Sequence, residues 1–279
     1  MEKQTKRQLR SLDGLSVLFI GNSFIYYGNC VADKSRDNDE GYFFQLARSN
    51  NERVRVYNYT YGGKNLKYIY ENHLQHESAD FFPQFDIVFL SEAGENNANI
   101  IRDIKNIMAL FPEKTEFCYL CHEYTHLANH ENILSAFGRM REMGLRIADW
   151  GGLVTRIWKG EVSVPFSETY YIRQTFFKSN KGATNGDFPV GAGRPGDEYH
   201  QNPLSGYICA LLAYCTVSGR QAYGAEFKFA TDKSVHPLFD TEAFVRSHYN
   251  NGVGTNMNEV LSSEIEMRGI QMLIDEVVE

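Results

Sequence analysis

The sequence predicts an α/β fold in which a parallel sheet of five strands is covered by helices on both faces. Three observations support this prediction. Short apolar runs alternate with longer segments of helical period, and the runs have the length of buried strands. Polar residues suited to chemistry follow several of these runs, where open parallel sheets bind their ligands.

The strands are predicted over five apolar runs: Ser16–Ile20, Arg53–Tyr59, Asp86–Ser91, Glu116–Cys121 and Leu145–Trp150. Helices are predicted between them, over Tyr42–Ser49, Leu66–His76, Ala98–Leu110 and Asn129–Met143. Another helix, Pro203–Val217, has Pro in its first turn and Gly219 after its end, which is typical of helix boundaries. We interpret residues 1–279 as a single domain, with a core over about residues 14–220 and a helical C-terminal extension over 221–279.

The composition is that of a folded globular protein, and it excludes some classes of partner. Hydrophobic residues make up 43% of the 279, enough for one substantial core. The net charge of -7 and the lack of a later basic cluster argue against nucleic acid as a partner. Leu15–Ile20 is too short to span a bilayer or to serve in a signal peptide. We therefore expect no membrane span and a cytoplasmic protein, or an exported one only if a leader was removed.

Five cysteines, an odd and widely spread set, predict reduced thiols instead of a disulfide framework. The sequence leaves the oligomeric state open.

Four groups of polar residues and glycines stand where a parallel sheet would bind a ligand. Gly21-Asn22-Ser23 follows the first predicted strand, and Tyr61-Gly62-Gly63 follows the second. Gly94-Glu95-Asn96-Asn97 follows the third, and Asp197-Glu198-Tyr199-His200 precedes the Pro203 helix. Each group alone has an ordinary explanation as a helix cap, a tight turn or a solvated loop.

Together the four groups offer the parts of a nucleophilic site. A Ser at a strand-to-helix turn can expose its hydroxyl. Asp197 and His200 are three residues apart, so in a helical turn the carboxylate can reach the ring and fix its tautomer. Backbone N–H groups and a side-chain amide at strand ends can donate to a developing oxyanion.

In this order, the groups resemble the four blocks of the SGNH/GDSL hydrolase superfamily over roughly residues 16–219. The first block, usually Gly-Asp-Ser, reads Gly21-Asn22-Ser23, and the fourth, Asp-x-x-His, matches Asp197 to His200. The glycine of the second block maps to Gly63, with Gly62 as the alternate. The third block, Gly-x-Asn-Asp, matches Gly94-Glu95-Asn96 and departs at Asn97, so either Asn96 or Asn97 is the candidate amide donor.

The resemblance implies a three-layer α/β/α fold with a flavodoxin-like five-stranded parallel sheet, and the activity of a serine esterase. In the implied mechanism Ser23 is the nucleophile, His200 is its general base and Asp197 orients His200. The oxyanion hole would combine the N–H of Ser23, the N–H of Gly63 and the amide of Asn96. The reaction needs no cofactor and no metal.

Substrate contacts are expected at Tyr26, just past the nucleophile, and at His122 and Glu123, which follow the fourth strand. The expected substrate is a small-molecule or carbohydrate ester, with a short acyl (acetyl) group on a carbohydrate preferred. A lipid esterase, a thioesterase or an acyltransferase on the same fold is the alternative.

The stretch around His122 also fits two other motifs. His122-Glu123-Tyr124-Thr125-His126 fits H-E-x-x-H of zinc proteases, which needs both histidines on one face of a helix, whereas here the motif directly follows a strand. Cys118-Tyr119-Leu120-Cys121-His122 fits C-x-x-C-H of haem attachment, but within a strand the two cysteines would point to opposite faces.

A lipase-type elbow is set aside because Phe24 and Ile25 follow Ser23, where G-x-S-x-G needs a second glycine. A zinc hydrolase using His122, Glu123 and His126, or a binding module without catalysis, are the less favoured alternatives.

Overall fold

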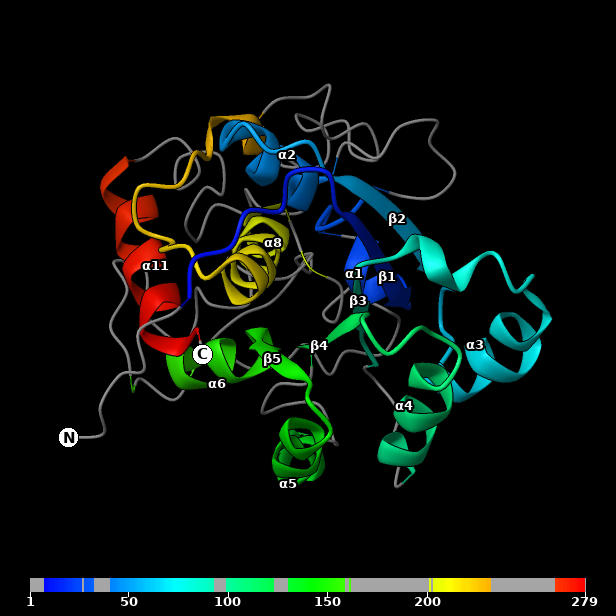
Figure 1. Cartoon of the computed structure of the whole chain (residues 1–279). Helices are drawn as coiled ribbons and strands as arrows, with labels where there is room; N and C mark the ends of the chain where they lie inside the picture. The colour runs from blue at the N-terminus through cyan, green and yellow to red at the C-terminus, as the bar shows by residue number, and fades with distance from the viewer. Residues whose placement is uncertain are drawn as a thin grey trace, which may run out of the picture.

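The computed structural model describes residues 8–26, 28–32, 41–92, 99–122, 130–158, 161, 201, 203–231 and 264–278. Within them, five strands form one parallel sheet in the order β2-β1-β3-β4-β5. The strands are β1 (Ser16–Gly21), β2 (Arg55–Thr60), β3 (Ile87–Leu90), β4 (Glu116–Cys121) and β5 (Arg146–Asp149). This order is the flavodoxin-like one, and helices cover both faces of the sheet (Figure 1). The predicted three-layer fold is therefore confirmed.

Two helical layers enclose the sheet (Figure 1). One layer contains α2 (Tyr42–Ser49), α6 (Trp150–Trp158), α8 (Pro203–Ser218) and α11 (Glu264–Val277), and the other contains α3 (Leu66–Asn72), α4 (Ile100–Met108) and α5 (His130–Glu142). Neighbouring strand residues point to opposite layers: Phe19 of β1 joins the core beneath α8, whereas Leu18 and Ile20 join the core beneath α3 and α4. The central strands are thus apolar on both faces, as is usual for parallel sheets.

Helix α8 lies between the sheet and α11 (Figure 1) and is buried along its length. This position explains why its sequence is apolar almost throughout and lacks a polar face. Gly219 follows the helix with φ +69, the left-handed conformation that favours glycine just after a helix end. In the part of the chain that the structure describes, none of the helices is long and apolar enough to cross a membrane.

In two of the predicted elements, another helical element replaces the last residues. The helix predicted over Leu66–His76 breaks after Asn72, and a 3-10 turn, η1 (Leu74–His76), follows. At the break the ring of His73 stacks on Tyr61 at a centroid distance of 3.8 Å, a tertiary contact that replaces the continuous helix.

The fifth strand ends at Asp149, not at Trp150, because Trp150 begins α6, a helix that the sequence analysis did not predict. Further short 3-10 turns are η2 (Phe82–Gln84) and η3 (Lys228–Thr231).

All five cysteines are buried and free, as the sequence predicted. Cys118 faces the core beneath α8, and Cys121 faces the core beneath α4 and α5. Their opposite orientations follow from their odd spacing in β4, and the pair has no geometry for haem attachment.

Candidate active site

The carboxyl ends of β1, β2 and β3 lie side by side. The N–H of Tyr61 donates to the carbonyl of Gly21 at 2.9 Å, and the N–H of Ser91 donates to the carbonyl of Ile20 at 2.9 Å. These bonds continue the sheet ladder by one residue beyond two of the strands. The structure therefore brings Ser23 and the Gly62-Gly63 turn to one edge of the sheet, the edge at which parallel sheets bind ligands.

Ser23 is the first residue of a short helix, α1 (Ser23–Tyr26), which begins directly after β1. The Oδ1 atom of Asn22 accepts the N–H of Phe24 at 3.1 Å, and the carbonyl of Asn22 accepts the N–H of Ile25 at 3.1 Å. Asn22 is therefore the cap of α1, so the simple explanation of Ser23 as the capping residue does not hold. The Ser23 residue is 7% exposed.

Gly21 is required by close packing. A Cβ at this position would lie 2.7 Å from the carbonyl oxygen of Ser91 and 2.7 Å from the side chain of Ile25. Only glycine lets the end of β1 approach β3 this closely, which gives the first block of the motif a physical reason for its glycine.

The Gly62-Gly63 turn lies beside α1. The N–H of Lys64 donates to the carbonyl of Tyr61 at 3.1 Å, and Gly63 has φ +68, as a type II turn requires at its third residue. A Cβ on Gly62 would lie 3.0 Å from the hydroxyl of Tyr26, so the half-buried Tyr26 faces this turn. The oxyanion role of Gly63 or Gly62 and the substrate contact of Tyr26 stay predictions.

Glu92, which the sequence analysis did not single out, follows β3 with a buried carboxylate. Its Oε2 accepts the N–H of Leu66 at 2.8 Å, and its backbone carbonyl accepts the hydroxyl of Tyr119 at 3.1 Å. Because Leu66 begins α3 three residues after Gly63, Glu92 ties the glycine turn to the end of β3. The sequence signal was an acidic residue directly after the predicted strand Asp86–Ser91.

His122 directly follows β4 and is fully buried. Its Nδ1 lies 2.7 Å from Oγ of Ser91, and its Nε2 lies 3.3 Å from Sγ of Cys209. Both ring nitrogens are therefore engaged, and His122 itself does not lie on a helix, whereas the rest of the H-E-x-x-H motif lies outside the described residues. Among the described residues, no group of three His, Cys, Asp or Glu side chains is placed to hold a metal ion.

The predicted role of His122 as a substrate contact stays a prediction. Several other predicted site residues lie outside the described residues: Gly94, Asn96, Asn97, Glu123, His126, Asp197 and His200.

The structure does place Gln201, the neighbour of His200. Gln201 is fully buried, and its Cβ lies 2.8 Å from the position that a Cβ on Gly28 would take. Gly28 belongs to the turn after α1, in which the N–H of Asn29 donates to the carbonyl of Tyr26 at 2.9 Å. The chain next to the predicted base is thus held against the segment that follows the predicted nucleophile.

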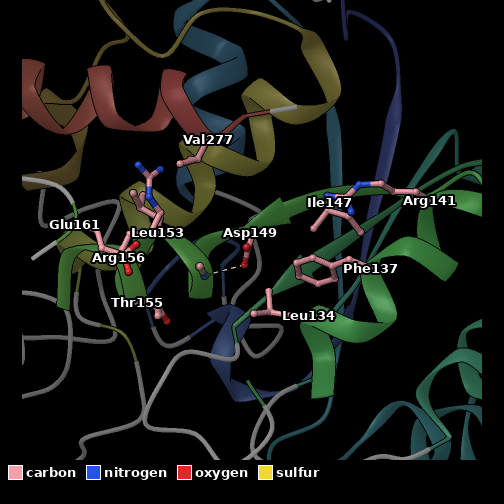
Figure 2. Close-up of a pocket in the computed structure, with 11 residues that line it drawn as sticks. Leu134, Phe137, Arg141, Ile147, Asp149, Leu153, Thr155, Arg156, Glu161 and Val277 are labelled. Carbon is pink, nitrogen blue, oxygen red and sulfur yellow. Dashed lines mark hydrogen bonds between the residues drawn. The ribbon is translucent and has the colours of Figure 1, made fainter. Parts of the chain in front are cut away.

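A separate cavity of about 330 Å³ opens at the end of β5, between α5 and α6 (Figure 2). Asp149 lies at its centre and accepts the N–H of Gly152 at 2.8 Å, while Arg141 and Arg156 lie on opposite sides of Asp149 in Figure 2. Its lining contains none of the predicted catalytic residues. Because β3 and β4 separate β5 from β1, this cavity is distinct from the Ser23 edge.

No protein-family model matches the chain, and no curated protein matches it in sequence. Among solved structures, a DUF4886 family protein from Bacteroides uniformis ATCC 8492 is similar over 95% of this chain and 94% of its own, with 14% identity and a TM-score of 0.51. The chain shares the fold of this protein.

Two further solved structures, with lower TM-scores, carry the name SGNH hydrolase or G-D-S-L family in their descriptions. A proposed SGNH hydrolase from Slackia heliotrinireducens matches over 74% of this chain and 100% of its own, at 14% identity and a TM-score of 0.44. A member of the lipolytic protein G-D-S-L family from Veillonella parvula DSM 2008 matches over 71% and 95%, at 15% identity and a TM-score of 0.42. At these identities the likeness concerns the fold, and the activity has to be argued from the residues.

Proposed function

We propose that this protein is a serine hydrolase that cleaves a carboxylic ester through an acyl-enzyme on Ser23. The observation that carries the proposal is the position of Ser23 at the first turn after β1, with Asn22 serving as the cap. A Ser that is not the helix cap, and that lies at the edge where parallel sheets bind ligands, suits the role of nucleophile.

The position of Gln201 supports the rest of the triad. Gln201 packs on the turn after α1, and it is the residue next to His200 in the sequence, which supports the proposed pairing of His200 with Ser23. His200 accepts the proton of the Ser23 hydroxyl as the oxygen attacks the ester carbonyl, and Asp197 stabilises the resulting imidazolium. The alcohol leaves with that proton, and water then releases the acid from Ser23 by the same steps.

The oxyanion is held by the N–H of Ser23, the N–H of Gly63 and the amide of Asn96. Removal of one such donor typically costs on the order of 100- to 1,000-fold in rate. Glu92 and the type II turn hold the Gly63 backbone in place for this role.

The decisive test compares wild type with Ser23→Ala on a chromogenic short-chain ester. We expect hydrolysis by the wild type and its loss in the variant. Because Ser23 is only 7% exposed, a thermal melt of the variant is needed to show that it is still folded at the assay temperature. Activity that survives Ser23→Ala but disappears with a chelator would instead favour the zinc alternative.

For the substrate, we propose a short acyl group, acetyl first, on a carbohydrate. The half-buried Tyr26 beside the Gly62 turn offers an aromatic face and a hydroxyl, which suit contacts with a sugar. A screen over acyl chain length, followed by acetate release from acetylated sugars, tests this. A preference for long acyl chains would favour a lipid esterase and exclude the carbohydrate proposal.

A further inference from the structure

His122 joins two strand ends to the helix that covers them. Ser91, bonded to Nδ1 at 2.7 Å, follows β3, and Cys209, bonded to Nε2 at 3.3 Å, lies on α8. All three residues are buried. A buried ring with a partner at each nitrogen has one preferred position, because loss of either bond leaves a polar group unsatisfied.

The ring also lies close to the nucleophile segment. The ring of Phe24, the residue after Ser23, is 6.1 Å from that of His122, measured between centroids, and Trp150 at the start of α6 is 5.7 Å away. His122 is therefore in position to transmit a shift of α8 to α1.

Cys209 is the point at which two segments of the predicted site meet. Burial raises the pKa of the Cys209 thiol, but hydrogen bonds with Cys30, His122 and Gln201 and the electrostatic interaction with His122 outweigh burial, so the pKa is lowered overall. The pKa of Cys30 is raised by burial and by Cys209, which keeps Cys30 protonated as a donor to the Cys209 sulfur. Cys30 belongs to the segment after α1, and Gln201 is adjacent to the predicted base.

We propose that His122, together with Ser91 and Cys209, is a positioning group that fixes α1 and the start of α8 relative to each other. The inference rests on the proposed function, since it is the spacing of Ser23 and His200 that the group would set. The histidine that begins the H-E-x-x-H motif then acts through its two hydrogen bonds. A misplacement of about 1 Å in such a site can cost roughly 100-fold in rate.

Cys209→Ala tests the proposal, with Cys215→Ala as the matched control. Both remove a buried thiol from α8, but only Cys209 bonds to His122. We expect Cys209→Ala to lower kcat about tenfold or more, with KM changed less than about twofold, because substrate binding is kept and alignment is lost. Cys209→Ser keeps a hydrogen-bonding group opposite Nε2 and should restore most of kcat, whereas Cys215→Ala should keep the wild-type value.

Hydrogen exchange measured by mass spectrometry provides a readout that does not depend on activity. Cys209→Ala should speed exchange in peptides covering residues 22–32 and 201–206, and Cys215→Ala should not. If Cys209→Ala does not fold, Ser91→Ala removes the opposite bond of the same ring and takes its place.

Two results would overturn the proposal. In the first, Cys209→Ala keeps the kcat and the hydrogen exchange of the wild type. In the second, Cys209→Ala and Cys215→Ala lose kcat equally, and each loss matches the fall in melting temperature of that variant. If the wild type hydrolyses esters no faster than Ser23→Ala, the proposed function fails. The exchange measurement then decides the positioning role by itself.

Discussion

Gly206→Ala should separate α8 from the turn that follows α1. A Cβ on Gly206 would lie 1.6 Å from the carbonyl oxygen of Gly28 and 2.2 Å from its carbonyl carbon. Non-bonded carbon and oxygen atoms do not approach closer than about 3 Å, so the two backbones must move apart by roughly 1.5 Å. Neither partner can yield by rotating a side chain, because both contacts are to backbone atoms.

The size of the effect follows from which segments this movement separates. Gly28 comes five residues after Ser23, and Gly206 six residues after His200, so we expect the shift to change the distance between the proposed nucleophile and the proposed base. Misplacement by 1 Å costs roughly 100-fold in rate, and we expect kcat/KM of Gly206→Ala to fall by at least about that factor. Overpacking at a site this tight should also cost about 1–3 kcal/mol of unfolding free energy.

Initial rates on a chromogenic short-chain ester, together with thermal melts, measure both effects. Gly138→Ala is the matched control, because Gly138 lies within α5 and a Cβ there meets nothing within 4 Å. This control should keep wild-type activity and gain up to about 1 kcal/mol from better helix propensity. Wild-type kcat/KM in Gly206→Ala, measured well below its melting temperature, would refute the role of this contact in setting the distance between the proposed triad residues.

Three further predictions concern single residues. Asn22→Ala removes the cap of α1, so the free energy of unfolding measured by urea denaturation should fall by about 1 kcal/mol, and kcat in the ester assay should fall as well. Asn22→Asp keeps a capping oxygen and should keep the free energy of unfolding of the wild type. Glu52→Ala should cost about 3 kcal/mol in the same denaturation, because its buried carboxylate accepts three hydrogen bonds, and the KM of the folded variant should be unchanged. Hydrogen bonds from Arg53 lower the pKa of Asp13 from 3.8 to about 2. The Asp13–Arg53 pair therefore stabilises the folded state above about pH 4, and this contribution is lost as the pH falls through 2. Asp13→Asn should therefore be less stable than wild type at pH 7 and equal to it below pH 2.

The strands and most helices could be predicted because burial sets their pattern directly. β1, β3 and β4 are buried on both faces, so their apolar runs are continuous, and β4 has the bounds that its sequence predicts. Helix α6 was missed because Gly151 and Gly152 follow Trp150, and consecutive glycines argue against a helix. Two interactions outweigh that low helix propensity. The Asp149 side chain accepts the N–H of Gly152, and Trp150 is buried in the core.

The candidate site was predictable only as far as strand order determines it. Ser23 and the glycine turn follow strands that turn out to be neighbours, so their place at one edge could be inferred from the sequence. The capping role of Asn22 and the anchoring role of Glu92 depend on hydrogen bonds to particular backbone atoms, which a strand pattern does not specify. The two partners of His122 lie 31 and 87 residues away, so no local motif could identify them.

Asn22 also explains why the first block can depart from the usual Gly-Asp-Ser. The cap of α1 needs a side-chain oxygen to accept the N–H of Phe24, and Asn provides that oxygen as well as Asp does. The amide differs in carrying no charge. A carboxylate beside Ser23 would oppose the negative charge that develops on a substrate oxygen during attack, whereas an amide does not. The Gly-Asn-Ser form therefore keeps the local geometry of the block and removes an unfavourable charge next to the proposed oxyanion.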